Sequence, residues 1–512
     1  MENEVFRGLA EQDKMMYNRS KEQGRACTAP DFARRRREVF RGFAKRICEK
    51  KIKEEDVMTK TKDAFYSQIW KLVLPILIQN LLSSMVSSAD VIMLSAVDQD
   101  SISAVSLASQ YANILFSVFY GLGTGVTMLC AQYYGKKDMK AINVVQGIAM
   151  RFSMVFCTVF ALCAAIFPKQ MMWVFTKNER LIELGADYLR VISISYFCWG
   201  IIEVYLAVLR SIERVEICTV LNTMAFGLNV VLNAVFIYGL FGAPKLGVLG
   251  VAIATSASRV IELIGCYVVS AYSKDAKLKL SYMFIKNRVL FKDFVRLSLP
   301  ALGNDVVWGV AFSMYAAIIG NISDDAVAAN AVAVVVRNFG TIFCYGIASA
   351  GGVLIGKIIG ENDMEGARSG AKKMMKLTVI SGIVGGLIVL VASPAVLWYS
   401  ETFSGLTPTA LGYLKWMLII NSYYISGTAV NTSLIAGIFR AGGDSKFGFI
   451  CDTIDMWCYA IPVGLLAAFV FKWPVMVVYF LLCTDEFVKW PWVIRHYKSG
   501  KWLNNITRDD WA

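Results

Sequence analysis

Long apolar runs alternate with short polar segments along most of this chain. From residue 65 onward we count about twelve such runs, each near the roughly 20 apolar residues that a helix needs to cross a bilayer. Backbone amides and carbonyls in lipid must bond within their own segment, so runs of this length predict helices. The pattern therefore predicts an all-α polytopic membrane protein with about twelve transmembrane helices.

The composition agrees with this class. Apolar residues make up 56% of the 512 residues, and the mean hydropathy is +0.52, which is high for a soluble chain. The twelve cysteines form no CxxC pair and lie mostly inside apolar runs, which predicts reduced packing residues. His496 is the only histidine, so an ordinary zinc site is not expected. We therefore expect no cofactor and no metal beyond a coupling ion.

The formal net charge of +13 is distributed among the loops in alternation. Every second loop is basic, and the loops between them carry few cations. Because basic loops stay in the cytoplasm, both termini are expected inside and the helix count is expected to be even. This placement predicts a multi-pass protein of the inner membrane in contact with lipid, and it argues against nucleic acid as a partner. The basic segments hold Lys136, Lys137 and Lys140; Arg210 and Arg214; residues 274–296; Arg368, Lys372, Lys373 and Lys376; and Arg440 and Lys446.

Residues 1–64 are polar and basic and lack the apolar core of a signal peptide. We expect a cytoplasmic segment, either disordered or in part a basic amphipathic helix on anionic lipid. A further alternative is that translation starts at Met58, because residues 53–56 can be encoded by a purine-rich ribosome-binding sequence. Peptides from residues 1–57 in the native protein would exclude that alternative.

The second half of the chain repeats the first with a shift of 225 residues. Two copies with an even number of helices share one orientation, an arrangement that lets transporters rock two lobes about a site between them. We expect an N-terminal lobe at 65–272, a cytoplasmic linker at 273–292, a C-terminal lobe at 293–498 and a tail at 499–512. The matching pairs include Pro75 and Pro300, Gly121 and Gly346, Gly135 and Gly360, and Asp138 and Asp363.

One acid in the predicted spans has no cation near it in sequence. Asp90 lies roughly 30 Å along the first helix, where a carboxylate in lipid needs a specific reason. On the fifth helix Asn229 and Asn233 share a face, and Thr255 on the sixth lies at a similar depth. An acid, two amides and a hydroxyl suit a hard cation, and an unpaired acid can instead bind a proton. These four residues are the predicted binding site for the coupling ion, Na⁺ or H⁺.

Three other polar residues are assigned to the substrate cavity: Asn80, Asp305 and Asp485. Asp305 lies in the inner half of the seventh helix, where this helix should line a cavity, and Asp485 lies closer to mid-membrane. A structural role for Asp305 is equally compatible with its position.

The remaining charges in the spans are spaced for ion pairs. Arg259 and Glu262 are three residues apart on one helix face, and so are Glu486 and Lys489. The two pairs stand at equivalent places in the repeat with the order of signs reversed. We expect structural ion pairs within each helix or between the lobes.

Four short motifs lie in the predicted helices or at their ends. They are Leu74-Pro75 with Asn80 and Asp90; Ala131-Gln132-Tyr133-Tyr134-Gly135 with Asp138; Asn229 to Asn233 followed by Phe236; and Phe439-Arg440-Ala441-Gly442-Gly443-Asp444. Together they resemble the multidrug and toxic compound extrusion (MATE) family over residues 65–505. The resemblance implies two six-helix lobes around a cavity, and efflux of small organic, cationic compounds against entry of Na⁺ or H⁺.

The resemblance also bears on the predicted ion site. In one branch of the family, the residues that match Asp90 and the polar positions of helices 5 and 6 form the cation site. That branch usually has an aspartate where this chain has Asn233, so one formal negative charge remains, which suits a single monovalent ion. The seventh-helix glutamate of the other branch is not matched, although Asp305 is near. We expect a monomer.

Two other functions, a flippase and an intramembrane enzyme, fit the sequence less well than an exporter. A lipid-linked saccharide flippase of the same superfamily often has fourteen helices and a cavity rich in cations, which this sequence lacks. An intramembrane enzyme needs paired aspartates, a serine with a base, or histidines deep in the helices. Only Asp452 and Asp455 come close, and they lie near the inner end of their helix, so we expect no enzyme.

Overall fold

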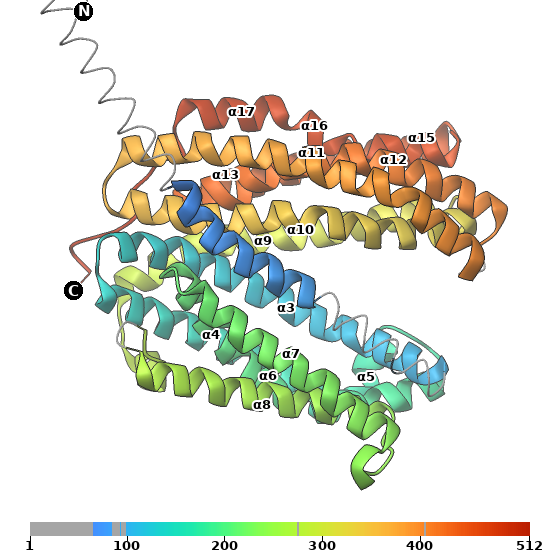
Figure 1. The fold of residues 1–512 in the computed structure, drawn as a ribbon, viewed down its shortest axis with the longest axis horizontal. Helices are drawn as coiled ribbons and strands as arrows, with labels where there is room; N and C mark the ends of the chain where they lie inside the picture. The colour runs from blue at the N-terminus through green and yellow to red at the C-terminus, as the bar shows by residue number, and fades with distance from the viewer. Residues whose placement is uncertain (1–64, 84–92, 94–98, 274–275, 404–405, 512) are drawn as a thin grey trace, which may run out of the picture. The chain divides into compact units, whose positions relative to one another are not determined.

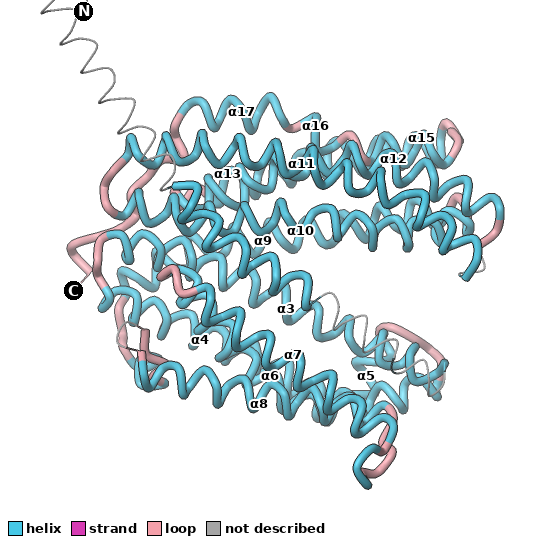
Figure 2. The backbone as a smooth tube through the Cα atoms, in the orientation of Figure 1, coloured by secondary structure: helices cyan, strands magenta, loops and turns pink. Residues whose placement is uncertain are grey.

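The computed structural model describes residues 65–83, 93, 99–273, 276–403 and 406–511. Residues 69–512 form one unit, and the account below concerns the described part of it. Figure 2 shows helices joined by short loops and no strand in this part of the chain. The predictions for residues 1–57, the start at Met58 included, lie outside the described residues.

The helices of the N-terminal lobe lie side by side in Figure 1. The helix α6 is central, because it packs against α3, α4 and α8, while α7 packs on α8. The lobe comprises a helix over residues 65–83, α3 (Gln99–Gly135), α4 (Met139–Ile166), α5 (Pro168–Trp173), α6 (Glu179–Ser211), α7 (Val215–Tyr238), the 3₁₀ turn η1 (Leu240–Gly242) and α8 (Val248–Tyr272).

The C-terminal lobe follows a short 3₁₀ turn, η2 (Leu280–Phe284), which packs on α4. Here α10, α11 and α12 pack on one another, and α9 packs on α13. The elements are α9 (Arg288–Gly320), α10 (Asp324–Gly360), α11 (Met364–Phe403), α12 (Pro408–Asn431), the π-helix η3 (Thr432–Phe439), α13 (Ser445–Ile454), the π-helix η4 (Asp455–Ala460), α14 (Ile461–Leu465), the π-helix η5 (Leu466–Val470), α15 (Val475–Leu482), α16 (Asp485–Val488) and α17 (Trp490–Ser499).

Nine segments among the described residues are long and apolar enough to cross a membrane. They are α3, α4, α6 to α11, and residues 445–470, which α13 to η5 form without a break, while α5 is too short. The helix over residues 65–83, α12 with η3, and α15 to α17 supply three further segments. The prediction of an all-α polytopic fold with about twelve spans in two six-helix lobes is confirmed.

The sequence repeat reappears in the local structure of both lobes. The Asp138 carboxylate accepts a hydrogen bond from the Ala141 amide at 3.0 Å and caps α4. Its repeat partner Asp363 accepts from the Gly366 amide at 2.8 Å at the start of α11. A capping aspartate satisfies amides that the first helical turn leaves unbonded. The two copies therefore begin their third helices in the same way.

Helices α3 and α10 cross closely at their C-terminal ends. A side chain on Gly135 would meet the Lys357 carbonyl, and one on Gly360 would meet the Gln132 carbonyl. These two glycines are repeat partners, and each allows the other copy's backbone to approach. The repeat thus places a glycine in each copy where the two helices cross.

Residues 500–511 pack against both lobes beside this crossing. The Gln132 side chain donates to the carbonyls of Ala441 (2.7 Å) and Asn504 (3.1 Å) and accepts from the Ile506 amide (2.8 Å). Arg508 donates two hydrogen bonds to Asp293, at 2.6 and 2.9 Å, and this carboxylate raises the pKa of the Arg508 guanidinium. The segment expected as a simple tail thus connects α3 with the C-terminal lobe.

Candidate functional site

Three of the four residues predicted for the ion site lie together in the N-terminal lobe. The Asn233 amide donates to the Asn229 carbonyl oxygen at 3.2 Å, and the Asn229 amide donates to the Thr255 hydroxyl at 3.2 Å. Both asparagines are buried, and they join α7 to α8. The chain of amides and a hydroxyl offers oxygen ligands without a formal charge of its own.

The fourth residue of that set, Asp90, lies outside the described residues. Helical residues 69–83 precede it and bond to α7: the Gln79 amide donates to the Thr219 hydroxyl at 2.6 Å, and Asn222 donates to the Gln79 oxygen at 3.2 Å. Asn80, predicted for the substrate cavity, is half-buried on the same helix. The first helix and α7 are therefore joined through polar side chains.

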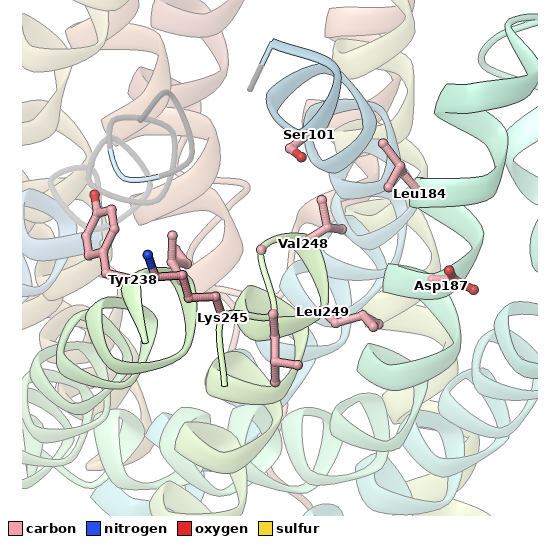
Figure 3. Close-up of a pocket in the computed structure, with 10 residues that line it drawn as sticks. Ser101, Leu184, Asp187, Tyr238, Lys245, Val248 and Leu249 are labelled. Atoms are coloured by element: carbon pink, nitrogen blue, oxygen red, sulfur yellow. The ribbon is translucent and has the colours of Figure 1, made fainter. Parts of the chain in front are cut away.

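A pocket of about 560 Å³ opens where α7 ends and α8 begins (Figure 3). Tyr238 and Lys245 lie on one side of it, and Ser101 and Leu184 lie on the other. Asp187 on α6 also lines the pocket, so it carries one acid and one base. Because Ile237 lies one helical turn after Asn233, the pocket lies beside the amide chain.

Two acids inside the helices of the N-terminal lobe are each paired with an arginine. Arg259 lies 2.8 Å from Glu262, which is fully buried, and its guanidinium stacks over Trp199 at 5.1 Å from the ring centroid. Arg210 lies 3.9 Å from Glu203. The expected ion pair within α8 is present, and each acid in this group has its own base.

Five buried charged residues of the C-terminal lobe form a cluster instead of separate pairs. The Lys489 ammonium lies 3.0 Å from Asp452, 3.2 Å from Glu486 and 3.8 Å from Asp455. Asp485 adjoins them, because one of its oxygens accepts from the Glu486 amide at 2.7 Å. We call these five residues the Lys489 cluster. The predicted pair of Glu486 and Lys489 is present, but the ammonium is shared among three carboxylates.

Two predicted cavity residues of this lobe are held by other side chains. Asp485 is fully buried, and the Tyr315 hydroxyl donates to it at 3.1 Å. Asp305 lies 2.9 Å from Arg440, which also donates to the Asn304 oxygen at 3.0 Å. Asn80, Asp305 and Asp485 are not brought together by any hydrogen bond or ion pair that the described residues show.

Asn304 links these groups to one another. Its amide donates to the second oxygen of Asp452 at 2.8 Å, and Arg440 also donates to Thr124 on α3 at 3.3 Å. A polar connection therefore runs from Lys489 through Asp452, Asn304 and Arg440 to the N-terminal lobe.

Two arginines of the site were missed or misplaced by the sequence reasoning. Arg440 was expected in a basic loop, but it is buried at the end of η3. Arg337 lies within α10 and was not singled out; its guanidinium stacks on Phe312 (5.3 Å) and Tyr424 (5.6 Å). An arginine inside an apolar run is costly, which was the signal available for Arg337.

Comparisons with known proteins agree along most of the chain. A family model described as MatE matches residues 75–235 and 306–466. The chain is 24% identical to an uncharacterized transporter, YisQ, of Bacillus subtilis, over 87% of this chain and 97% of the relative. It is 23% identical to a probable multidrug resistance protein, NorM, of Thermotoga maritima, over 85% of this chain and 92% of the relative.

Solved structures show the same fold. One is a multidrug resistance MATE family transporter of the MOP superfamily in an outward-facing conformation, with a TM-score of 0.76 and 19% identity. The match covers 85% of this chain and 96% of that one. Another is a MOP superfamily transporter from Pyrococcus furiosus, with a TM-score of 0.76 over 84% of this chain.

Proposed function

Because the chain belongs to the MatE family, we propose that it is a secondary active exporter of small organic, cationic compounds, driven by entry of Na⁺ or H⁺. The relatives are transporters, and several carry the name of multidrug resistance proteins. On this proposal the protein is a monomer in the cytoplasmic membrane, with the basic loops and both termini inside.

The observation that carries the proposal is the hydrogen-bonded chain of Asn233, Asn229 and Thr255. Three polar side chains inside a membrane-spanning lobe are costly unless they serve a bound group or one another. The two asparagines are buried and Thr255 is half-buried where α7 meets α8, and Asp90, which the sequence predicts on the first helix, would complete a site for a cation. The pocket where α7 ends and α8 begins supports an access route from outside.

One ion is sufficient for useful work. For an uncharged substrate, a unit charge that crosses about 100 mV supplies about 2.3 kcal/mol, which supports a substrate gradient of roughly fiftyfold. Exchange of one ion for a monovalent cationic substrate moves no net charge and draws on the concentration gradient of the ion. Binding of the ion neutralises Asp90, so the N-terminal lobe can repack around an uncharged site. Exit of the ion on the inside restores the charge and the original packing.

The lobes must separate on the inner side during this cycle. The contacts that hold them there include the Lys357–Glu213 ion pair at 2.7 Å and the Arg440–Thr124 hydrogen bond at 3.3 Å. Both join the C-terminal lobe to the N-terminal one. We infer that they stabilise the state that is closed inside and break when drug enters from the cytoplasm.

The flippase alternative has less support. A site for a lipid pyrophosphate needs cations that are free to bind it. Arg440 is bonded to Asp305, and Arg337 lies against two aromatic rings. Two of the relatives are likewise named as probable multidrug resistance proteins.

Replacing the proposed ion-binding acid tests the function directly. Asp90→Asn should abolish efflux of ethidium from cells while the protein still reaches the membrane, because the site loses its only formal charge. Glu179→Gln, which changes an exposed acid at the start of α6 away from the pocket, should retain efflux. Full efflux in Asp90→Asn would dismiss Asp90. Vesicles with an imposed Na⁺ gradient, and then an imposed H⁺ gradient, would identify the ion.

A further inference from the structure

The Lys489 cluster contains more acid than base. Asp452, Asp455, Asp485 and Glu486 surround a single ammonium, and all five residues are at most 4% exposed. The carboxyl groups therefore exceed the cations by three. Each additional buried charge without a partner would cost several kcal/mol, so a cluster of this kind is not stable in fully ionised form.

Neighbouring elements do not supply the missing positive charge. Arg440, at the end of η3, is engaged by Asp305 of α9. Arg337 of α10 lies on the rings of Phe312 and Tyr424, and counting it in full still leaves two carboxyl groups in excess. The other ionisable groups that interact with the cluster carry no positive charge. They are Tyr315 from α9, Tyr345 from α10, Tyr423 and Tyr424 from α12, Cys451 from α13, and Cys483 after α15.

Several buried polar atoms at the cluster lack hydrogen-bond partners in the described part of the chain. Asn431 donates to Glu486 at 2.5 Å, but its own oxygen accepts nothing. Both oxygens of Asp455 and one of Glu486 also accept no hydrogen bond, and the Tyr424 hydroxyl has no partner. Buried acceptors of this kind are rare in proteins, because each loses its bonds to water. They indicate that hydrogens or a ligand belong among these oxygens.

The backbone around the cluster is also irregular. Asn431 is the last residue of α12 before the π-helix η3, and Asp455 begins the π-helix η4. Departures from α-helical hydrogen bonding of this kind occur often at functional sites, because they redirect side chains. Two separate helices therefore change their register where they meet the excess acid.

A proton fits the cluster better than a metal ion. Among the described residues, no group of three His, Cys, Asp or Glu side chains is arranged to hold a metal ion. A proton needs no such geometry, since it converts one carboxylate into a donor that can bond to a neighbouring oxygen. We propose that Asp455, Asp485 and Glu486 form a proton-binding site in the C-terminal lobe and hold at least one shared proton at neutral pH.

The role of this site rests on the proposed function, although its existence does not. A change in its proton content alters the charge between α16 and the segment of α13 and η4. The polar connection through Asn304 and Arg440 then links that change to Thr124 in the other lobe. The protein would accordingly bind protons in the C-terminal lobe in addition to the ion bound at Asp90.

Infrared spectroscopy of the full-length protein in detergent tests the proposal. Wild-type protein at pH 7 should show the carbonyl stretch of a protonated carboxylic acid, shifted on transfer to D₂O. Asp485→Asn and Asp455→Asn should each remove part of this band, and the double variant should remove more. Glu365→Gln, which changes an exposed acid at the start of α11, should leave the band unchanged. Absence of the band in wild-type protein, or an unchanged band in the double variant, would overturn the proposal.

A further variant and a test with Na⁺ complete the infrared experiment. Tyr315→Phe keeps the ring and removes only the hydroxyl that donates to Asp485, so it can replace an aspartate variant that does not fold. The band frequency should shift in Tyr315→Phe, and an unshifted frequency would contradict the site. Adding Na⁺ at pH 7 should leave the infrared band unchanged. Loss of the band on adding Na⁺ would show that Na⁺ can replace the proton and would overturn the proposal. The assay needs no transport, so failed efflux with an intact band would reject the exporter and retain the site.

Discussion

The two lobes bury their charges in opposite ways. In the N-terminal lobe, Arg259 pairs with Glu262 and Arg210 with Glu203, so acids and bases are matched. In the C-terminal lobe, three carboxylates share Lys489 and a fourth, that of Asp485, adjoins them. Both sets stand on copies of one six-helix unit. The duplication has preserved the scaffold, with its capping aspartates and crossing glycines, and it has not preserved the charge.

This difference separates structural charge from exchangeable charge. A balanced set can stay as it is through a transport cycle, because its internal attraction offsets the desolvation of both partners. A set with excess acid must take up something positive from outside the protein. Substitutions that remove one charge at a time from each lobe test this distinction.

Lys489→Met should cause the largest loss. Among the described residues it removes the one ammonium within ion-pair distance of three buried carboxylates, and breaking buried pairs typically costs about 3–5 kcal/mol. The free energy of unfolding, measured by SDS titration of the detergent-solubilised protein, should fall by that amount. The exposed Lys372→Met on α11 should change it by less than about 0.5 kcal/mol. A Lys489→Met variant as stable as wild type would mean that the cluster does not depend on its cation.

Arg259→Gln should have an intermediate effect. It leaves the fully buried Glu262 without its base and removes the contact over Trp199, for a loss of about 1–3 kcal/mol. The control is Arg190→Gln, which breaks an exposed pair with the same spacing to Asp187 at 3.7 Å and should cost less than about 1 kcal/mol. Equal losses in the two variants would show that burial does not distinguish these pairs.

Asp485→Asn should have the smallest effect on stability. Its acid is in excess, and an amide of the same shape can still accept from the Tyr315 hydroxyl, so the loss should be about 1 kcal/mol or less. The matched change in the balanced lobe, Glu262→Gln, leaves Arg259 without a carboxylate and should cost more in the same titration. The opposite order would remove the distinction between the two lobes.

Much of the fold could be predicted from the sequence. Apolar run length determines the helices, since lipid allows few other structures, and the repeat of Gly135 and Gly360 marked positions that now cross. Asn229, Asn233 and Thr255 were expected at one depth and are hydrogen-bonded. Their role in binding an ion stays a prediction, as does that of Asp90.

The charged cluster could not be predicted from spacing alone. The interval of three residues placed Asp452 beside Asp455 and Glu486 beside Lys489, but it could not show that the two helix faces meet. Arg440 was expected in a loop because it was counted with Lys446 among the basic connections, whereas in the structure it is buried and bonded to Asp305 and Asn304. Partners on separate helices depend on packing, which local sequence does not specify.

The segment at residues 500–511 has a consequence for how the protein is made. Gln132 emerges from the ribosome early, yet its side chain bonds to Ala441, Asn504 and Ile506, which are synthesised more than 300 residues later. The Gln132 side chain at the end of α3 therefore lacks these partners until translation is nearly finished. A chain that stops before residue 504 would keep that defect, and quality-control proteases could recognise it as unfinished.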